Sequence, residues 1–276
     1  MNKKIYWHNA FYACYKLEFD EFLPFLEFID EYQLSEEALI MDVLLIKKDP
    51  TVTINKNIGK IFRMHNITEY KSPSDSLTIS DYHKIMGYAF LYATFNNVPL
   101  AEITITFVIN RYPRLLIKYL QTERQLNVTE QESGIYYVNG DVFPMQILES
   151  KKLSQDSNIF LNTLRGGLNA KELALVSEKG NKINKFESRN PFYDRIIAAN
   201  KKIFKEVMEM GKGWREEFFY DIYVHSEEFK KHLAKHEEEH SVSIAKRMLS
   251  LGNSIENIAL STDLPIETVE NLRNAM

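Results

Sequence analysis

Three residues with the types and spacing needed for phosphodiester chemistry lie in the first third of the chain. Glu69 and Lys71 end the alternating stretch HNITEYK, and Asp42 interrupts the apolar run ALIMDVLLIKK. Residues two apart in a strand point to the same face, so Glu69 and Lys71 should lie side by side. Carboxylates can hold Mg²⁺ against a phosphate oxygen, and a neighbouring lysine can orient the attacking water. The pattern therefore predicts a site at Asp42, Glu69 and Lys71.

A purely structural interpretation of these three residues stays open. An acid and a base two residues apart are common in strands, and such a pair can simply stabilise a strand at its exposed end. Asp42 is less easily explained in this way, because buried strands seldom carry an aspartate in mid-run without a reason. We expect Lys71 to lie at the exposed end of its strand.

A second candidate site is the motif HEEEH, His236 to His240, which fits the H-E-x-x-H pattern of zinc proteases. His232 adds a third histidine on the same helical face. The surrounding sequence KKHLAKHEEEHSVS is nearly all charged, whereas catalytic zinc needs a packed cleft and a further ligand. A solvated helix is the favoured interpretation, and a zinc hydrolase is kept as an alternative function.

The elements that would position these residues follow from hydrophobic periodicity. We expect strands at 25–34, 38–48, 60–71 and 103–109, a hairpin at 134–148 turning at Asn139-Gly140, and helices at 8–22, 80–95 and 112–125. Pro144 should push the second arm of the hairpin to a sheet edge. Beyond about residue 155 the strand signals stop, and helices are expected at 190–210, 226–252, 255–260 and 265–272.

Composition limits the classes of protein that fit. The formal net charge of −4 argues against a surface coated in basic residues, although a local basic groove remains compatible with it. Cys14 is the single cysteine, so no disulfide can form within the chain, and its aromatic surroundings favour a buried role. No apolar segment approaches the ~18 residues that span a membrane, and no signal peptide is recognised. We expect a cytoplasmic protein without a membrane partner.

The stretch from DVLLIKK to GYAFLYA, with EYKSP between them, resembles the core of the PD-(D/E)XK nuclease superfamily. It is particularly similar to bacterial recombination-promoting nucleases and putative transposases, and the tail AKRMLSLGNSIENIALSTDLPIETVENL also resembles theirs. The resemblance covers about residues 20–150 and the last ~35. It implies a restriction-endonuclease-like α/β domain over 1–155, a helical region over 156–240 and a helix-turn-helix-like tail over 241–276.

The same resemblance implies metal-dependent hydrolysis of DNA. Asp42 and Glu69 would bind Mg²⁺ or Mn²⁺, and Lys71 would orient the water. Met41 departs from the proline in the superfamily name. An acid from the first helix often joins such sites, with Glu27 and Glu31 the nearest candidates. Some members of these families no longer cut, so a non-catalytic nucleic-acid-binding or assembly protein is the main alternative.

Basic residues that could contact DNA phosphates fall in two groups. Arg111, Arg114 and Lys118 recur with helical spacing, and Lys60 and Arg63 precede the strand that carries Glu69. A solvated basic face explains the first group equally well. The second helix of the tail, PIETVENLRNAM, offers only Arg273 for reading bases, so we expect the tail to serve packing or assembly of a homo-oligomer.

Overall fold

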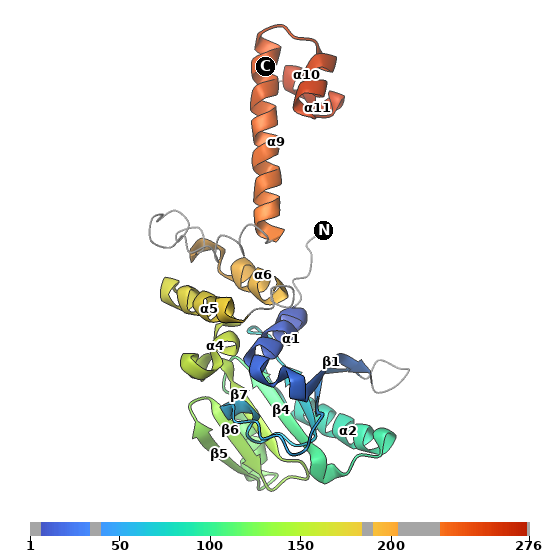
Figure 1. Cartoon of the computed structure of the whole chain (residues 1–276), viewed down its shortest axis with the longest axis vertical. Helices are drawn as coiled ribbons and strands as arrows, with labels where there is room; N and C mark the ends of the chain where they lie inside the picture. Colours follow the sequence, from blue (N-terminus) through green and yellow to red (C-terminus); the bar gives the residue numbers. More distant parts are fainter. Residues whose placement is uncertain (1–6, 34–39, 184–189, 204–226, 275–276) are drawn as a thin grey trace. The chain divides into compact units, whose positions relative to one another are not determined.

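The computed structural model describes residues 7–33, 40–183, 190–203 and 227–274 (Figure 1). The chain divides into two compact units between residues 218 and 219. The first unit contains a seven-stranded mixed sheet flanked by helices, and the described part of the second unit is helical. This confirms the expected α/β class with a helical C-terminal region. The domain boundaries expected from the sequence, after residues 155 and 240, stay predictions.

The sheet has the strand order β1-β2-β3-β4-β7-β6-β5. Its strands are β1 (Leu26–Gln33), β2 (Ile40–Lys47), β3 (His65–Tyr70), β4 (Ile103–Ile109), β5 (Asn127–Glu132), β6 (Ile135–Asn139) and β7 (Met145–Glu149). The three central strands β3, β4 and β7 are parallel, and all other neighbours are antiparallel. We call the end at which β3, β4 and β7 finish the carboxyl end of the sheet. Because β2 is antiparallel to β3, β2 begins at this end.

Helices cover both faces of the central strands. The helices of the first unit are α1 (Trp7–Glu18), α2 (Ile79–Asn96), α3 (Arg114–Thr122), α4 (Gln155–Thr163), α5 (Ala170–Lys182) and α6 (Asn190–Ala199), with short 3₁₀ turns η1 (Asp20–Phe25), η2 (Asn57–Gly59), η3 (Leu100–Glu102) and η4 (Ser150–Lys152). One core cluster joins α2 and α3 to the odd-numbered residues of β4, and α1 packs on the opposite face through Phe11, which stacks on Tyr70. Every residue of β4 is buried, as expected for a parallel strand covered on both faces.

Three expectations from the sequence need correction. Strand β3 begins only at His65, because residues 57–59 form η2 and the chain turns after it. The connection between β6 and β7 runs from Gly140 to Pro144 and is not a two-residue turn. Pro144 does not mark a sheet edge, since β7 lies between β4 and β6 and the Pro144 carbonyl accepts a hydrogen bond from Ile105.

Strand β5 was not expected, because its sequence NVTEQE is polar. It forms the outer strand of the sheet, where most of its side chains are exposed. An edge strand with one partner needs no continuous apolar face, so the hydrophobic pattern that reveals central strands is missing here.

Helix α4 is anchored to α1 by a buried ion pair across a kink. At Asn158 the backbone leaves the helical region. The Glu18 carboxylate accepts a hydrogen bond from the Leu161 N–H at 2.8 Å and pairs with Lys56 Nζ at 2.8 Å. Lys56 also donates to the Ser157 carbonyl at 2.5 Å. The Glu18 carboxylate therefore accepts from a backbone N–H after the kink, and the Lys56 ammonium donates to a backbone carbonyl before it. Both ions lie beside backbone groups of complementary charge, as at helix ends.

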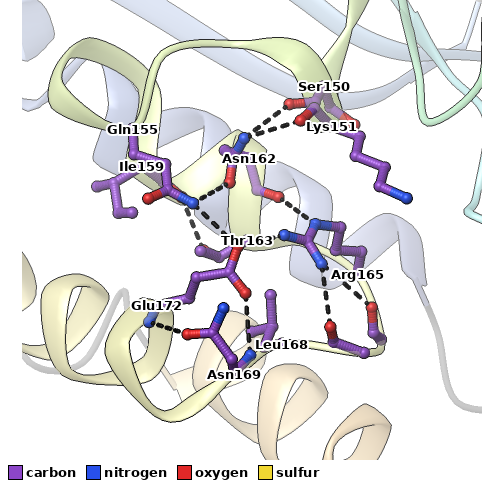
Figure 2. Close-up of polar contacts among 12 residues, drawn as sticks. Ser150, Lys151, Gln155, Ile159, Asn162, Thr163, Arg165, Leu168, Asn169 and Glu172 are labelled. Carbon is purple, nitrogen blue, oxygen red and sulfur yellow. Dashed lines mark hydrogen bonds and ion pairs between the residues drawn. The ribbon is translucent and has the colours of Figure 1, made fainter.

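A polar network fixes the segment that follows β7 to α4 and α5 (Figure 2). The Asn162 amide donates to the Lys151 carbonyl at 3.1 Å, and Gln155 donates to Asn162 at 3.0 Å. Arg165 pairs with Glu172 at 2.5 Å, and Glu172 completes a capping box with Asn169 at the start of α5. These bonds hold the chain rigidly just after the carboxyl end of β7.

The second unit contains α9 (Glu227–Ser250), α10 (Ile255–Thr262) and α11 (Ile266–Asn274). Its buried core consists of Ala245, Ile258 and Val269, one from each helix, with a few partly buried neighbours. The two short helices and the end of the long helix agree with the sequence expectation. Ser226, expected to cap the long helix, lies outside the described residues.

Candidate active site

The structure brings Asp42 and Glu69 to adjacent strands at the carboxyl end of the sheet. The β2–β3 ladder ends at the pair of Val43 and Thr68, and Asp42 and Glu69 are the residues next to this last pair on the two strands. Beyond the ladder the two side chains meet different helices: Asp42 Oδ1 lies 3.4 Å from His8 Nδ1 of α1, whereas Glu69 Oε1 lies 2.8 Å from Lys84 Nζ of α2, on the other face of the sheet. The prediction that the two strands are neighbours is confirmed. After burial, the Glu69 charge is the second cause that raises the pKa of Asp42.

Glu69 is a buried carboxylate with an unsatisfied oxygen. Its Oε1 accepts from Lys71 Nζ at 3.0 Å and from Lys84 Nζ at 2.8 Å. Its Oε2 is buried and has no hydrogen-bond partner among the described residues. A buried carboxylate oxygen without a partner is costly and marks a place where a ligand would be stabilising.

Asp42 is held by the chain through both of its oxygens. Oδ2 accepts a 2.8 Å hydrogen bond from the Tyr70 backbone N–H, and Oδ1 lies 3.4 Å from His8 Nδ1 at the start of α1. Burial first, and then the Glu69 charge, raise the pKa of Asp42 to about 6. The carboxyl group is therefore poised to change protonation near neutral pH, and a cation would favour its ionised form.

Lys71 lies between two acids. Its Nζ contacts Glu69 at 3.0 Å and Asp81 at 2.8 Å, and its side chain is only 17% exposed. The expectation of an exposed lysine at the strand end is therefore wrong, because α2 begins directly over it. Burial lowers the pKa of Lys71, but the bonds to Asp81 and Glu69 outweigh burial and raise it, so the ammonium form is favoured.

Sequence reasoning missed three residues of this cluster, namely His8, Asp81 and Lys84. Asp81 is the third residue of α2 and forms a capping box with Thr78, which places it beside Lys71. Lys84 follows one helical turn later, on the same side of α2. The capping sequence predicts the helix start, and the spacing of Asp81 and Lys84 could have shown that both face the strand that ends at Lys71.

The two upstream acids lie on the edge strand β1. Glu27 pairs in register with Ile46, near the end of β2 that is remote from Asp42. Glu31 is exposed, has a positive φ of 46°, and lies between the ladder pairs of Asp30 and Tyr32. In the described part of the chain, neither acid forms an ion pair or hydrogen bond with Asp42 or Glu69.

The expected phosphate-contacting residues lie at two different ends of the sheet. Arg111 follows β4 at the carboxyl end, and Arg114 and Lys118 continue along α3, all three exposed. Lys60 pairs with Glu132 at 3.3 Å, and Arg63 donates to the Ala101 carbonyl, both before β3 begins. Lys60 and Arg63 therefore do not flank the Glu69 and Lys71 pair.

The histidine motif lies in α9. His240 and Glu238 are exposed, whereas the side chains of His232 and His236 are outside the described residues. Across the described ranges, no group of three or more histidine, cysteine or acidic side chains is arranged to hold a metal. The zinc interpretation stays an untested alternative.

The residues at the carboxyl end of the sheet fit a magnesium-type cation. Such cations take oxygen ligands, keep several waters, and are commonly held by only one or two carboxylates together with substrate phosphates. Asp42 and Glu69 supply two carboxylates, and Glu69 Oε2 is an oxygen that no described group satisfies. Two acids with coupled charges would both be stabilised by such an ion.

Comparison with known proteins adds no relative: no family model, no curated protein and no solved structure matches this chain. Within the part of the chain that the structure describes, no helix combines the length and apolar character needed to cross a membrane.

Proposed function

We propose that the first unit is a metal-dependent phosphodiesterase that cuts DNA, with Asp42 and Glu69 as metal ligands and Lys71 as the group that orients the attacking water. The supporting observation is the buried Glu69 carboxylate, which has one oxygen without a partner among the described residues and lies on the strand next to the one that carries Asp42. A role in recombination or in mobile elements rests only on the sequence resemblance.

Each side chain has a definable task in this proposal. A bound Mg²⁺ or Mn²⁺ would supply Lewis-acid stabilisation of charge on the phosphate. The Tyr70 N–H and His8 hold the Asp42 carboxylate in place. Asp81 holds the Lys71 ammonium against Glu69, where it would lie beside an attacking water and stabilise the negative charge that develops.

One observation favours the non-catalytic alternative. Lys71 and Lys84 both bond to Glu69 Oε1, so two cations of the chain already offset the Glu69 charge. A protein that retained the fold for binding DNA, without cutting it, would keep such a closed cluster. The two functions differ in whether hydrolysis depends on a divalent cation.

The test is DNA cleavage by the purified full chain with Mg²⁺ or Mn²⁺. Plasmid nicking should require the metal, and Lys71→Ala should lower the rate about 10²–10³-fold, which is typical for loss of one charge-stabilising group. Lys48→Ala is the matched control, because Lys48 is an exposed lysine just after β2, at the opposite end of the sheet. Equal rates for the parent protein and both variants would assign the activity to another site or to a contaminant.

A parent protein that shifts DNA in a salt-sensitive manner, yet cuts with no divalent metal, would support the non-catalytic alternative instead.

A further inference from the structure

A second carboxylate–lysine pair lies two strands from Glu69, at the same end of the sheet. Glu149, the last residue of β7, is buried, and its Oε2 pairs with Lys152 Nζ at 2.9 Å. The Tyr136 hydroxyl donates to the same oxygen at 3.2 Å, and Lys152 donates to that hydroxyl at 3.3 Å. Lys152 also lies over the Tyr112 ring, 5.6 Å from its centre. The Glu149 carboxylate, the Tyr136 hydroxyl and the Tyr112 ring thus hold the ammonium group in place.

Lys152 is fixed and still accessible. Half of its side chain is exposed, while the Glu149 side chain beneath it is 9% exposed. The polar network after η4 holds the segment that carries Lys152 through Asn162, which binds the Lys151 carbonyl (Figure 2). An accessible cation on a rigid support loses little conformational freedom when it binds an anion.

Exposed cations connect this pair with the candidate active site. Lys84 lies over the end of β3 with 39% of its side chain exposed, and Arg111 is exposed directly after β4. Arg111 has no ion pair among the described residues, so its charge is available to a ligand. Since β3, β4 and β7 are neighbours, Lys84, Arg111 and Lys152 form a row across three adjacent strand ends.

Unsatisfied polar atoms lie near these strand ends, although the Tyr70 side chain faces α1 on the opposite side of the sheet from Lys84. Glu69 Oε2 and Tyr70 Oη at the end of β3 and Asn110 Oδ1 after β4 are all buried and lack a hydrogen-bond partner within the described residues. Native proteins satisfy most buried polar atoms, so the unpaired Glu69 oxygen beside Lys84 is a place where a polar ligand would be stabilising.

From these observations we infer that the DNA backbone lies across the carboxyl ends of β3, β4 and β7, with Arg111 and Lys152 binding phosphates away from the bond that is cut. This inference rests on the proposed function. Two strand spacings amount to ~10 Å, the length of about three phosphate repeats at ~3.4 Å along a duplex. A duplex whose axis follows this row, with one phosphate at the cluster around Glu69, would therefore place a phosphate about three nucleotides away at Lys152.

The experiment measures binding of a labelled DNA duplex to the full chain in EDTA, over a series of salt concentrations. Arg111→Gln and Lys152→Gln should each weaken binding about five- to tenfold at ~0.1 M salt and lower the slope of log K against log salt by about one. Lys48→Gln, at the opposite end of the sheet, is the matched control and should change neither quantity. Lys152→Arg keeps the charge and should restore the parent slope.

Arg111→Gln breaks no ion pair or hydrogen bond within the described residues. It therefore tests the proposed position of the DNA even if Lys152→Gln fails to fold. Parent-like affinity and slope in Arg111→Gln and in a folded Lys152→Gln would overturn the inference, as would a parent protein that does not bind DNA. Metal-dependent cutting that Lys71→Ala abolishes would in that case leave the proposed function standing. The converse result is a parent protein that binds DNA without cutting it, while Arg111→Gln and Lys152→Gln lower the slope of log K against log salt. That result would support the position of DNA across the ends of β3, β4 and β7 and would reject the hydrolytic function.

Discussion

Asp42 shows how one side chain can be costly to the fold and useful to a site. Its carboxyl pKa in the folded chain is about 6, above the ~3.9 of an unfolded aspartate, because of burial and then the Glu69 charge. Because the pKa of Asp42 is higher in the folded chain than in the unfolded chain, proton binding to Asp42 stabilises the fold. This contribution is complete below pH ~3.9 and is lost as pH rises through about 6. At neutral pH without metal, the ionised Asp42 therefore destabilises the protein.

Asp42→Asn should raise the free energy of unfolding of the metal-free protein at pH 7 by roughly 1–3 kcal/mol, the scale set by a shift of about two pKa units. The asparagine oxygen can still accept from the Tyr70 N–H. Urea unfolding at pH 4 and pH 7 checks this, and the gain over the parent should be smaller at pH 4. A variant that is less stable than the parent at pH 7 would contradict the assigned burial and charge effects.

Lys71→Ala should lower the free energy of unfolding by about 1.5–3 kcal/mol, the usual value of a hydrogen bond to a charged group. The physical reason is that Asp81 loses its 2.8 Å partner, while Glu69 keeps Lys84. Thermal unfolding measures the loss, and a cleavage assay well below the lowered melting temperature separates it from the effect on rate. A loss below about 0.5 kcal/mol would mean that Lys71 behaves as an exposed residue.

At the scale of elements, the Glu18–Lys56 pair joins α1 to the kinked α4. Glu18→Gln should destabilise the protein by about 3–5 kcal/mol, because Lys56 would be left with most of its charge buried and without a carboxylate. Glu132→Gln is the matched control, since the Glu132–Lys60 pair is about half exposed and should contribute at most about 1 kcal/mol. Equal losses in urea unfolding would show that burial does not distinguish the two pairs.

The central strands could be predicted from the sequence because their apolar runs are long and bounded by turn residues. Asp42 could be identified as a candidate because it is an acid inside such a run. Glu69 and Lys71 could be identified because they are two residues apart in a strand. Polar β5 and the central position of β7 could not be predicted, because they depend on which strands pair, a long-range property that local patterns do not encode. His8 could not be predicted as a site residue for the same reason, because only the packing of α1 on the sheet brings it to Asp42.

At the scale of the whole molecule, the chain contains two units with cores of very different size. Among the described residues, the core of the second unit has three fully buried side chains, so one buried charge should unfold it. Val269→Asp should remove most of the helical signal of this unit in circular dichroism, because an unpaired charge in a small apolar core costs several kcal/mol. Leu260→Asp is the control, because Leu260 is 84% exposed and its helix should remain. Equal loss of helix in both variants would contradict the described core.

The central claim is that Asp42 and Glu69 together bind one divalent cation, and calorimetric titration with Mn²⁺ tests it most directly. The account predicts one Mn²⁺ per chain in the parent protein, a strong loss of affinity in Glu69→Gln and Asp42→Asn, and parent-like binding in Glu149→Gln. Affinity should rise with pH through about 6, because the Asp42 carboxyl group must ionise to bind metal. Unchanged Mn²⁺ affinity in both Glu69→Gln and Asp42→Asn, or no binding by the parent at pH 8, would contradict the account.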